Sequence, residues 1–280
     1  MMGFKVSDKF FSIKDTLTCG QIFRFTESDG VYRVVSGDKL CYAMNYLDGV
    51  YIECKDTDID YFRHFFDLET DYSEIYNRAI SFGYEILERS AKEGRGIRIL
   101  NQNPLEMLFS FIDSQNNNIP RIKSIIEKLC TNLGEEREFF GEKYFAFPSV
   151  SKMANATLDF YKSIGLGYRA EYILTLAKDI NNNGFNEEKL SKLSTNELLE
   201  ELLKIKGVGK KVADCVLLFG FRRTDSFPVD TWIDKVYKEN FNGKEKDRKK
   251  ISNYFVELFK EDSGYFQQYL FYYKRSIENK

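Results

Sequence analysis

Residues 202–215 read LLKIKGVGKKVADC, and this stretch decides how the second half of the chain folds. An apolar helical pattern stops at the turn Gly207-Val208-Gly209, and a second helix begins at once. Two glycines permit backbone conformations closed to other residues and let the backbone approach a ligand closely. The free N–H groups at the start of the second helix favour an anion such as a phosphate. The stretch therefore predicts two helices joined by an anion-binding turn, although a tight turn without a ligand has the same pattern.

Lys211 is the side chain of this stretch that is best placed for chemistry, in the first turn of the second helix. The helix dipole opposes a positive charge there, and the neighbouring Lys210 adds repulsion. Both effects favour the uncharged amine, which is the form in which a lysine acts as a nucleophile. Cys215 follows four residues later and is expected on the same helix face. A solvated surface lysine without a catalytic role is the alternative.

A second informative segment, FPVDTW, covers residues 227–232. Pro228 ends whatever precedes it, and Asp230 is placed as the N-cap of the next helix. A capping carboxylate accepts backbone N–H bonds and is held rigidly, which suits it to stabilising a nearby positive charge. Capping and catalysis do not exclude each other, so the pattern leaves both roles open.

Nearly all of the chain beyond Pro104 has helical periodicity. Residues 194–197, Ser-Thr-Asn-Glu, form a capping box that opens the first helix of the hairpin. The last helix is expected to run from about Gly264. We therefore expect a mostly helical body with the hairpin at residues 198–219. The predicted core stripes are Leu105, Leu108, Phe109 and Ile112; Ile119, Ile122, Ile125, Ile126 and Leu129; and Leu198, Leu199, Leu202 and Leu203.

The first third of the chain is β-rich, with short β-branched and aromatic runs separated by hairpin-type turns. The runs are 31–35, 40–44 and 50–54, and the turns are 28–30, 36–38 and 48–49. Helical periodicity begins near Tyr72, and a breaker cluster follows at residues 93–96. We therefore expect an α+β chain, with an antiparallel β-sheet domain and flanking helices over residues 1–96 and the helical body over residues 97–280.

The composition is that of a globular protein: 280 residues, 43% hydrophobic, 30% charged and a net charge of −2. No apolar run approaches the about 18 residues of a membrane span, and the N-terminus lacks a signal-peptide core, so we expect a cytoplasmic protein. The five cysteines contain no CxxC pair, which argues against zinc or an iron–sulfur cluster. The single histidine, His64, is expected to be packed or solvent-facing. The window 204–223 holds six basic residues and one acid, a charge suited to phosphate.

The two segments together resemble the helix-hairpin-helix/Gly-Pro-Asp (HhH-GPD) signature of base-excision DNA glycosylases: residues 207–211, GVGKK, followed by Pro228-Val229-Asp230. Four further segments, in the same order along the chain, resemble the eukaryotic-type 8-oxoguanine DNA glycosylases. They are the N-terminal motif 20–24, the asparagine-rich loop 114–121, the wedge loop 166–170 and the C-terminal helix 264–271. The likeness covers most of the chain and does not depend on a single motif.

The resemblance implies a role for each site residue. Lys211 would attack C1′ of the extruded nucleoside and form a Schiff base, with β-elimination of the strand afterwards. Asp230 would stabilise the positive charge that develops on the sugar. The Gly20 carbonyl would accept a bond from N7–H, which 8-oxoguanine has and guanine lacks, so that guanine would present a lone pair to a lone pair. The other base contacts would be Cys215 and Phe271 on the two faces and Gln267 on the Watson–Crick edge.

The resemblance also implies the contacts with the rest of the DNA. Removing a base from the stack leaves a gap, which a protein side chain must fill. The hairpin turn would hold a backbone phosphate without reading sequence. The implied residues are Asn116 and Tyr168 in the gap, Arg121 and Arg169 on the orphaned cytosine, and Gly207, Val208 and Gly209 on the phosphate.

At one position the chain departs from the family. Two residues past the aspartate, where the family commonly has a histidine on a DNA phosphate, the chain has Trp232. An indole donates one hydrogen bond but carries no charge, so this phosphate contact is in question. The family can also hold a monovalent or calcium-like cation on hairpin carbonyls, here those of Leu203, Ile205 and Val208. No organic cofactor is implied.

Three alternatives stand beside this interpretation. Endonuclease III and adenine-glycosylase types normally carry a C-terminal four-cysteine cluster, and no cysteine follows Cys215. A monofunctional alkylated-base glycosylase would have no use for Lys211. A non-catalytic helix-hairpin-helix module needs the glycine turn but neither Asp230 nor a base pocket. The sequence thus favours a monomeric, bifunctional glycosylase and lyase that acts on duplex DNA containing 8-oxoguanine, with cytosine as the expected opposite base.

Overall fold

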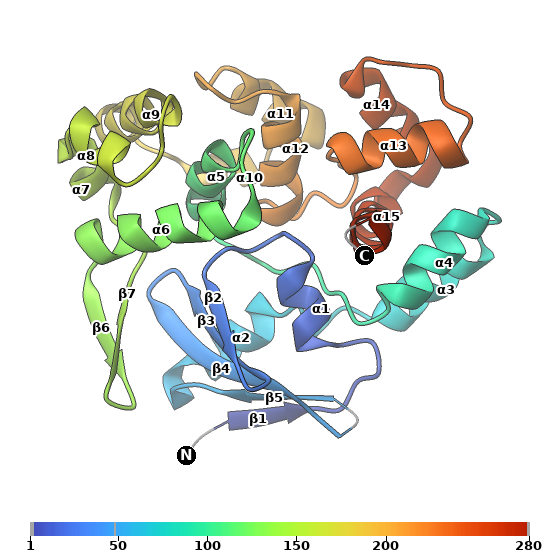
Figure 1. The fold of residues 1–280 in the computed structure, drawn as a ribbon, viewed down its shortest axis with the longest axis horizontal. Helices are drawn as coiled ribbons and strands as arrows, with labels where there is room; N and C mark the ends of the chain where they lie inside the picture. Colours follow the sequence, from blue (N-terminus) through green and yellow to red (C-terminus); the bar gives the residue numbers. More distant parts are fainter. Residues whose placement is uncertain (1–2, 48, 279–280) are drawn as a thin grey trace.

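The computed structural model describes residues 3–47 and 49–278 of the chain. The strands are β1 (Gly3–Val6), β2 (Phe25–Ser28), β3 (Val31–Ser36), β4 (Lys39–Tyr46), β5 (Gly49–Glu53), β6 (Glu136–Phe139) and β7 (Glu142–Phe145). The helices are α1 (Ile13–Thr18), α2 (Ile59–Phe65), α3 (Tyr72–Ser81), α4 (Glu85–Glu93), α5 (Pro104–Asp113), α6 (Ile119–Leu133), α7 (Val150–Asn155), α8 (Leu158–Ser163), α9 (Arg169–Asn183), α10 (Glu187–Ser191), α11 (Thr195–Leu203), α12 (Lys210–Phe219), α13 (Thr231–Asn240), α14 (Arg248–Phe259) and α15 (Ser263–Glu278). Figure 1 shows the sheet beneath a helical body, so the predicted α+β class is confirmed.

The N-terminal strands form an antiparallel sheet in the order β1-β5-β4-β3-β2. Asp29 and Gly30 connect β2 to β3 with positive φ angles of 51° and 79°, as a two-residue hairpin requires. The expected strands correspond to β3, β4 and β5, whereas β1 and β2 were not predicted. Of the third expected turn, Asp48 lies outside the described residues.

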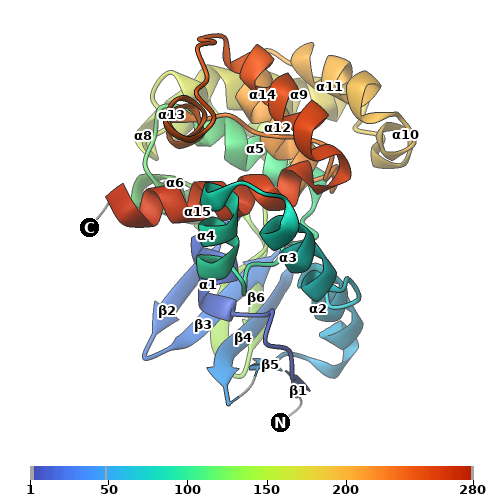
Figure 2. The same cartoon turned by 90° about the vertical axis from the view of Figure 1, so that its right-hand side faces the viewer.

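Apolar side chains from one face of the sheet pack against α1 and α2, and Figure 2 shows these helices beside the strands. Ile13, Leu17, Phe62 and Phe65 of the two helices are buried there. The packing fixes the end of α1, and Gly20 follows that end directly. His64 is exposed on α2, so the expectation of a solvent-facing histidine is confirmed.

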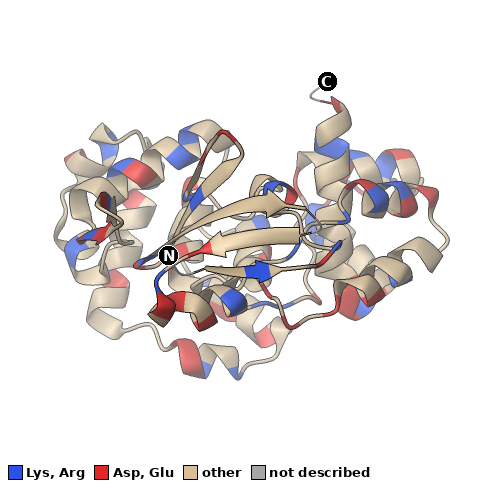
Figure 3. Cartoon of the chain, turned by 90° about the horizontal axis from the view of Figure 1, so that it is seen from below, with Lys and Arg blue, Asp and Glu red and all other residues tan. Residues whose placement is uncertain are grey.

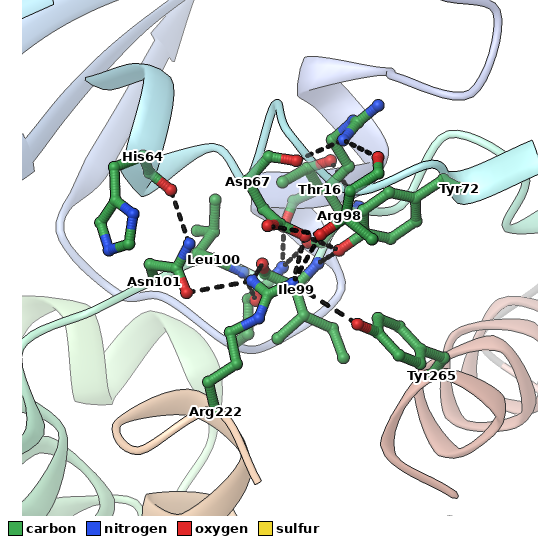
Figure 4. Close-up of polar contacts among 12 residues, drawn as sticks. Thr16, His64, Asp67, Tyr72, Arg98, Ile99, Leu100, Asn101, Arg222 and Tyr265 are labelled. Atoms are coloured by element: carbon green, nitrogen blue, oxygen red, sulfur yellow. Dashed lines mark hydrogen bonds and ion pairs between the residues drawn. The ribbon is translucent and has the colours of Figure 1, made fainter. Parts of the chain in front are cut away.

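A polar network joins the sheet domain to the body (Figure 4). Asp67 accepts a hydrogen bond from the Tyr72 hydroxyl at 2.8 Å and forms an ion pair with Arg222. Arg222 also donates to the carbonyl of Ile99 at 2.8 Å. The charge of this arginine, a member of the basic window 204–223, is therefore neutralised by a carboxylate far away in the sequence. Arg223 is likewise engaged with the backbone, on the carbonyls of Ser191 and Leu193.

The helical body is built around α5, which packs against α6, α9 and α12. The stripes predicted on α5 and α6 are buried apart from Leu105 and Ile119, which are partly exposed. The capping box at Ser194 is present. Leu203 is 39% exposed, so its assignment to the core is wrong; it lies at the end of α11, where the chain turns towards solvent.

Strands β6 and β7 form a hairpin inside the body, where only helices were predicted. Phe140 and Gly141 form its turn with positive φ angles. The two strands are short and rich in charged residues, so they carry little of the apolar alternation that marks a strand. Phe139 and Tyr144 pack against Val35 and Leu40 of the sheet, which explains why the hairpin forms at this place.

Helix α15 connects the two parts, because it packs against α4 on one side and α13 on the other (Figure 2). Phe266, Tyr269 and Leu270 are buried in this contact. The domain boundary expected between residues 96 and 97 follows α4 and stays a prediction. Among the described residues, none of the helices combines the length and apolarity that crossing a membrane requires.

Candidate active site

The hairpin has the predicted form: α11 ends at Leu203, α12 begins at Lys210, and Gly209 is the N-cap of α12. Gly207 has a φ of +89°, and a Cβ at this position would lie 2.6 Å from the Tyr172 ring. A glycine is therefore required both by the backbone conformation and by the close approach of a neighbouring helix. Gly209 is exposed, and a Cβ added to it would meet no atom within 4 Å, so a ligand can approach the N-terminus of α12.

Lys211 lies in the first turn of α12 and is partly buried. Its Nζ lies 3.4 Å from the Ser114 hydroxyl and 5.3 Å from the centre of the Phe111 ring. Lys210 points elsewhere, to the carboxylate of Asp214, with Nζ–Oδ distances of 2.5 and 2.7 Å. The repulsion expected from Lys210 is thus offset by an ion pair. The two neighbouring lysines have separate roles: Lys210 compensates a buried acid, and Lys211 faces a pocket.

Asp230 is the N-cap of α13, as predicted, and its Oδ1 accepts the N–H bonds of Trp232 and Ile233, both at 2.9 Å. Burial raises the pKa of this carboxyl, while the two N–H donors and the nearby ammonium of Lys211 oppose the shift. The carboxylate is held by the backbone of its own helix. It therefore keeps its position whether or not Lys211 is charged.

Lys211 and Asp230 line one pocket with a cavity volume of about 70 Å³. The pocket brings together all four residues expected to contact a base and both residues expected to be catalytic. Burial raises the pKa of Cys215 to about 11, so its thiol stays protonated and forms an uncharged wall. The lining residues are Cys19, Gly20, Phe111, Lys211, Cys215, Phe219, Pro228, Asp230, Gln267, Gln268 and Phe271.

Both the backbone conformation and the space available require a glycine at position 20 in the pocket wall. Its φ is +91°, and a Cβ here would lie 3.2 Å from the Phe271 ring and 3.3 Å from Nη1 of Arg275. The Arg275 guanidinium lies 5.1 Å from the centre of the same Phe271 ring. The segment after α1 and the side of α15 thus meet closely, and a side chain at Gly20 would narrow the pocket.

A groove of about 410 Å³ opens beside the pocket and shares Lys211 and Asp230 with it. Its other lining residues are Ser114, Gln115, Asn116, Asn117, Gly209, Val212, Thr231, Trp232 and Arg248. The asparagine-rich loop, the hairpin and the start of α13 therefore face a common space. Asn116 has a positive φ of 47°, and its Nδ2 lies 3.3 Å from the hydroxyl of Tyr168, which is 52% exposed. The two residues expected to fill a DNA gap lie next to each other.

The two arginines expected on a cytosine differ in their surroundings. Arg169 is 3% exposed, and its guanidinium donates to the carbonyls of Leu166, Gln115 and Asn116. Arg121 is exposed, and one of its N–H groups donates to the carbonyl of Gly165 at 3.0 Å. Arg169 therefore shapes the loop that carries Asn116, whereas Arg121 keeps donors for a ligand. Contact of either arginine with cytosine stays a prediction.

The hairpin carbonyls named for a cation lie in the turn between α11 and α12. The Ile205 carbonyl already accepts the Val208 N–H at 3.0 Å, which leaves one lone pair. Within residues 3–47 and 49–278, no group of three or more His, Cys, Asp or Glu side chains is arranged to hold a metal ion. The cation at Leu203, Ile205 and Val208 stays a prediction.

Sequence reasoning did not identify several lining residues: Phe111, Ser114, Arg248 and Gln268. Arg248 follows Lys244 and Lys246 in the basic segment 244–250, and this charge run was the signal that could have identified it. Seen from below, Lys and Arg are interspersed with Asp and Glu on the helices around the sheet (Figure 3). The groove itself is lined by two cationic side chains, Lys211 and Arg248, and by the carboxyl of Asp230.

Comparisons with known proteins agree with this arrangement. The family model "8-oxoguanine DNA glycosylase, N-terminal domain" matches residues 3–108, and the model "HhH-GPD superfamily base excision DNA repair protein" matches residues 109–261. A probable N-glycosylase/DNA lyase of Methanothermobacter thermautotrophicus is 30% identical over 75% of this chain and 71% of its own length. The N-glycosylase/DNA lyase of Saccharomyces cerevisiae is 35% identical over 52% of this chain and 42% of its own length. The crystal structure of Clostridium acetobutylicum 8-oxoguanine glycosylase/lyase, in complex with double-stranded DNA containing cytosine opposite 8-oxoguanine, has a TM-score of 0.92 and 35% identity, with 99% of each chain covered.

Proposed function

Because the chain belongs to the HhH-GPD superfamily of base excision DNA repair proteins, with the N-terminal domain of the 8-oxoguanine DNA glycosylases, we propose that it excises 8-oxoguanine from duplex DNA and then cleaves the strand as a lyase. One observation carries the proposal: a partly buried lysine and a capped aspartate line the same pocket as Gly20, Cys215 and Phe271. The names of the similar proteins, which combine glycosylase and lyase activities, support it.

The pocket suits a mechanism in which the lysine replaces the base. The uncharged amine of Lys211 attacks C1′, the C1′–N9 bond breaks, and its electrons leave with the base, which takes up a proton. One of the two amine protons leaves with the base; the C1′–O4′ bond then breaks, O4′ takes up a proton from solvent, and the nitrogen with its one remaining proton forms a protonated Schiff base with C1′. β-Elimination then removes a C2′ proton and expels the 3′ phosphate. Asp230 stabilises the positive charge on the sugar, because its carboxylate lies beside Lys211 and cannot swing away from its helix.

Gly20 would select the oxidised base. Its carbonyl accepts the N7–H of 8-oxoguanine, whereas N7 of guanine is an acceptor and would leave two lone pairs opposed. The close approach of Gly20 to Phe271 and Arg275 supports this role, because it fixes where the carbonyl lies relative to the wall of the pocket. Cys215 and Phe271 would hold the two faces of the ring.

The groove beside the pocket would hold the DNA. Asn116 and Tyr168 would fill the gap left by the extruded base, and Arg121 would donate to the opposite cytosine. The N–H groups at Gly209 would hold a phosphate at the start of α12. Trp232 offers no charge to the next phosphate, but Arg248 lines the same groove with an exposed guanidinium. We propose that Arg248 supplies the positive charge that the family's histidine would supply.

Arg248→Ala is expected to weaken binding to duplex DNA about five- to tenfold at moderate salt, because one phosphate contact is lost. The slope of log Kd against log salt concentration should fall by about one. Titration of a fluorescent duplex at several salt concentrations measures both quantities. Arg89→Ala, an equal change of charge at an exposed position of α4, is the control and should leave the slope unchanged. An unchanged slope for Arg248→Ala would remove this residue from the interface.

The proposed function is tested by incubating the protein with duplexes that contain one 8-oxoguanine opposite each of the four bases. We expect base release and strand cleavage, fastest opposite cytosine, and no reaction with an undamaged duplex. Binding without base release would instead support a non-catalytic helix-hairpin-helix module. Base release without strand cleavage, on duplexes with alkylated purines, would support a monofunctional glycosylase.

The single chain provides every residue of this pocket, which supports a monomer as the active species. A DNA substrate would place the enzyme in the cytoplasm at the nucleoid of a bacterial cell, or in a nucleus. No organic cofactor enters the proposed steps, because the leaving base and the proton transfers require none. Gel filtration at working concentration tests the monomer, and a larger species whose dissociation abolishes activity would contradict it.

A further inference from the structure

Two adjacent glutamines and one carbonyl form a polar chain in the wall of the base pocket. Gln267 and Gln268 are 4% and 3% exposed, and both line the pocket. Nε2 of Gln267 donates to the Pro228 carbonyl at 3.1 Å, and Nε2 of Gln268 donates to Oε1 of Gln267 at 2.7 Å. Oε1 of Gln268 is buried and, among the described residues, has no hydrogen-bond partner.

The Pro228 carbonyl determines which atom donates and which accepts in each hydrogen bond of this polar chain. A carbonyl can only accept, so the Gln267 atom beside it must be the amide nitrogen. The Gln267 oxygen then faces Gln268, whose nearest atom must in turn be a nitrogen. Rotating either amide by half a turn would bring two acceptors or two donors together in a buried place, which is costly. Gln267 is thereby left with one N–H and one lone pair, and Gln268 with one N–H and the acceptor Oε1, which has no partner among the described residues.

These free groups match one edge of a base. The Watson–Crick edge of a guanine ring presents the acceptor O6, the donor N1–H and the donor 2-amino group. The remaining N–H and lone pair of Gln267 pair with O6 and N1–H. A buried acceptor without a partner costs stability unless a ligand satisfies it. A purine with a 6-amino group would oppose Gln267 at both positions.

We propose that Gln268 determines specificity: its Oε1 accepts a hydrogen bond from the 2-amino group of the extruded base, and its Nε2 holds Gln267 in the orientation that reads a 6-oxopurine. This inference rests on the proposed function, since it concerns the base in the same pocket. Gly20 contacts the N7 side and identifies the oxidation, whereas the two glutamines identify the ring as guanine.

The test compares two duplexes that differ only in the 2-amino group, with 8-oxoguanine or 8-oxohypoxanthine opposite cytosine, under single-turnover conditions. We expect the wild-type protein to release 8-oxoguanine at least about tenfold faster, because a buried acceptor loses its donor with the second base. Gln268→Met keeps the length of the side chain and removes both the acceptor Oε1 and the Nε2 donor that holds Gln267. Release of both bases should slow through the loss of Gln267 orientation, but only 8-oxoguanine also loses the acceptor for its 2-amino group, so the ratio of the two release rates should fall to within about twofold.

Cleavage of a duplex with a preformed abasic site is the control for folding, because that substrate has no base to read. Gln268→Met should cleave it at the wild-type rate. A variant that keeps the full preference for 8-oxoguanine would overturn the inference. If the variant fails to fold, the wild-type protein still tests the inference, because equal rates of release of 8-oxoguanine and 8-oxohypoxanthine would also overturn the role of Gln268. No release of 8-oxoguanine by the wild-type protein would instead refute the proposed function.

Discussion

Lys211→Gln should abolish both base release and the covalent complex that borohydride traps, lowering the rate by about three orders of magnitude or more, since no other group can form the bond to C1′. Glutamine has a similar length and fits the contact with Ser114, but its amide nitrogen is not a nucleophile. The fold and the groove are expected to remain. The measurement is a single-turnover assay on an 8-oxoguanine duplex, with and without borohydride, followed by denaturing electrophoresis.

Lys192→Gln is a matched control, because Lys192 is an exposed lysine at the C-cap of α10 that pairs with Glu188. It should be trapped like the wild-type protein. Lys211→Gln should still bind a duplex with an uncleavable abasic-site analogue within a few-fold of wild type, since the groove residues are unchanged. An adduct that forms at the normal rate in Lys211→Gln would show that another amine attacks the sugar, and the assignment of the nucleophile would be wrong.

The parts of the fold that sequence reasoning predicted depend on contacts between near neighbours. The capping box at Ser194, the N-cap at Asp230 and the turn at Asp29 each involve residues within four positions of one another. The pairing of β6 with β7 is also local, but its strands are charged and only four residues long, so their packing on Val35 and Leu40 decides the structure. The sequence of the two strands contains no pattern from which their packing on the N-terminal sheet could be predicted.

The site shows the same division. The resemblance supplied Lys211, Asp230 and Gln267, because their motifs are continuous in sequence. It did not supply Gln268. The orientation of the Gln268 amide is set by Gln267, which in turn donates to the carbonyl of Pro228, 40 positions before Gln268. The pairing of Arg222, a member of the basic window 204–223, was not predicted for a related reason, since its partner Asp67 lies 155 positions away. The ion pair of Lys210 with Asp214 is only four positions apart, yet burial was needed to show that it forms.

Asp230→Asn is expected to slow base release by about 10² to 10³ while leaving affinity for abasic DNA within a few-fold of wild type. Asparagine can still accept the N–H bonds of Trp232 and Ile233 through its side-chain oxygen, so the N-cap and the helix should persist. What is lost is the negative charge beside Lys211. A structural cap and an electrostatic catalyst therefore give different results: the first would leave rate, stability and binding close to wild type, because asparagine still caps the helix, and the second lowers the rate alone.

The pH dependence separates these roles further. Because burial raises the pKa of Asp230 above its ordinary value, the carboxyl becomes protonated at a higher pH than a free aspartate would. Catalysis needs the ionised form, so the wild-type rate should fall as the pH decreases through this raised pKa. Asp230→Asn cannot titrate, and its slower rate should lack that decrease. Single-turnover rates measured from about pH 4 to 8, with thermal unfolding at each pH, distinguish the outcomes. An identical acidic decrease in both proteins would assign the titration to another group and leave Asp230 as a cap alone.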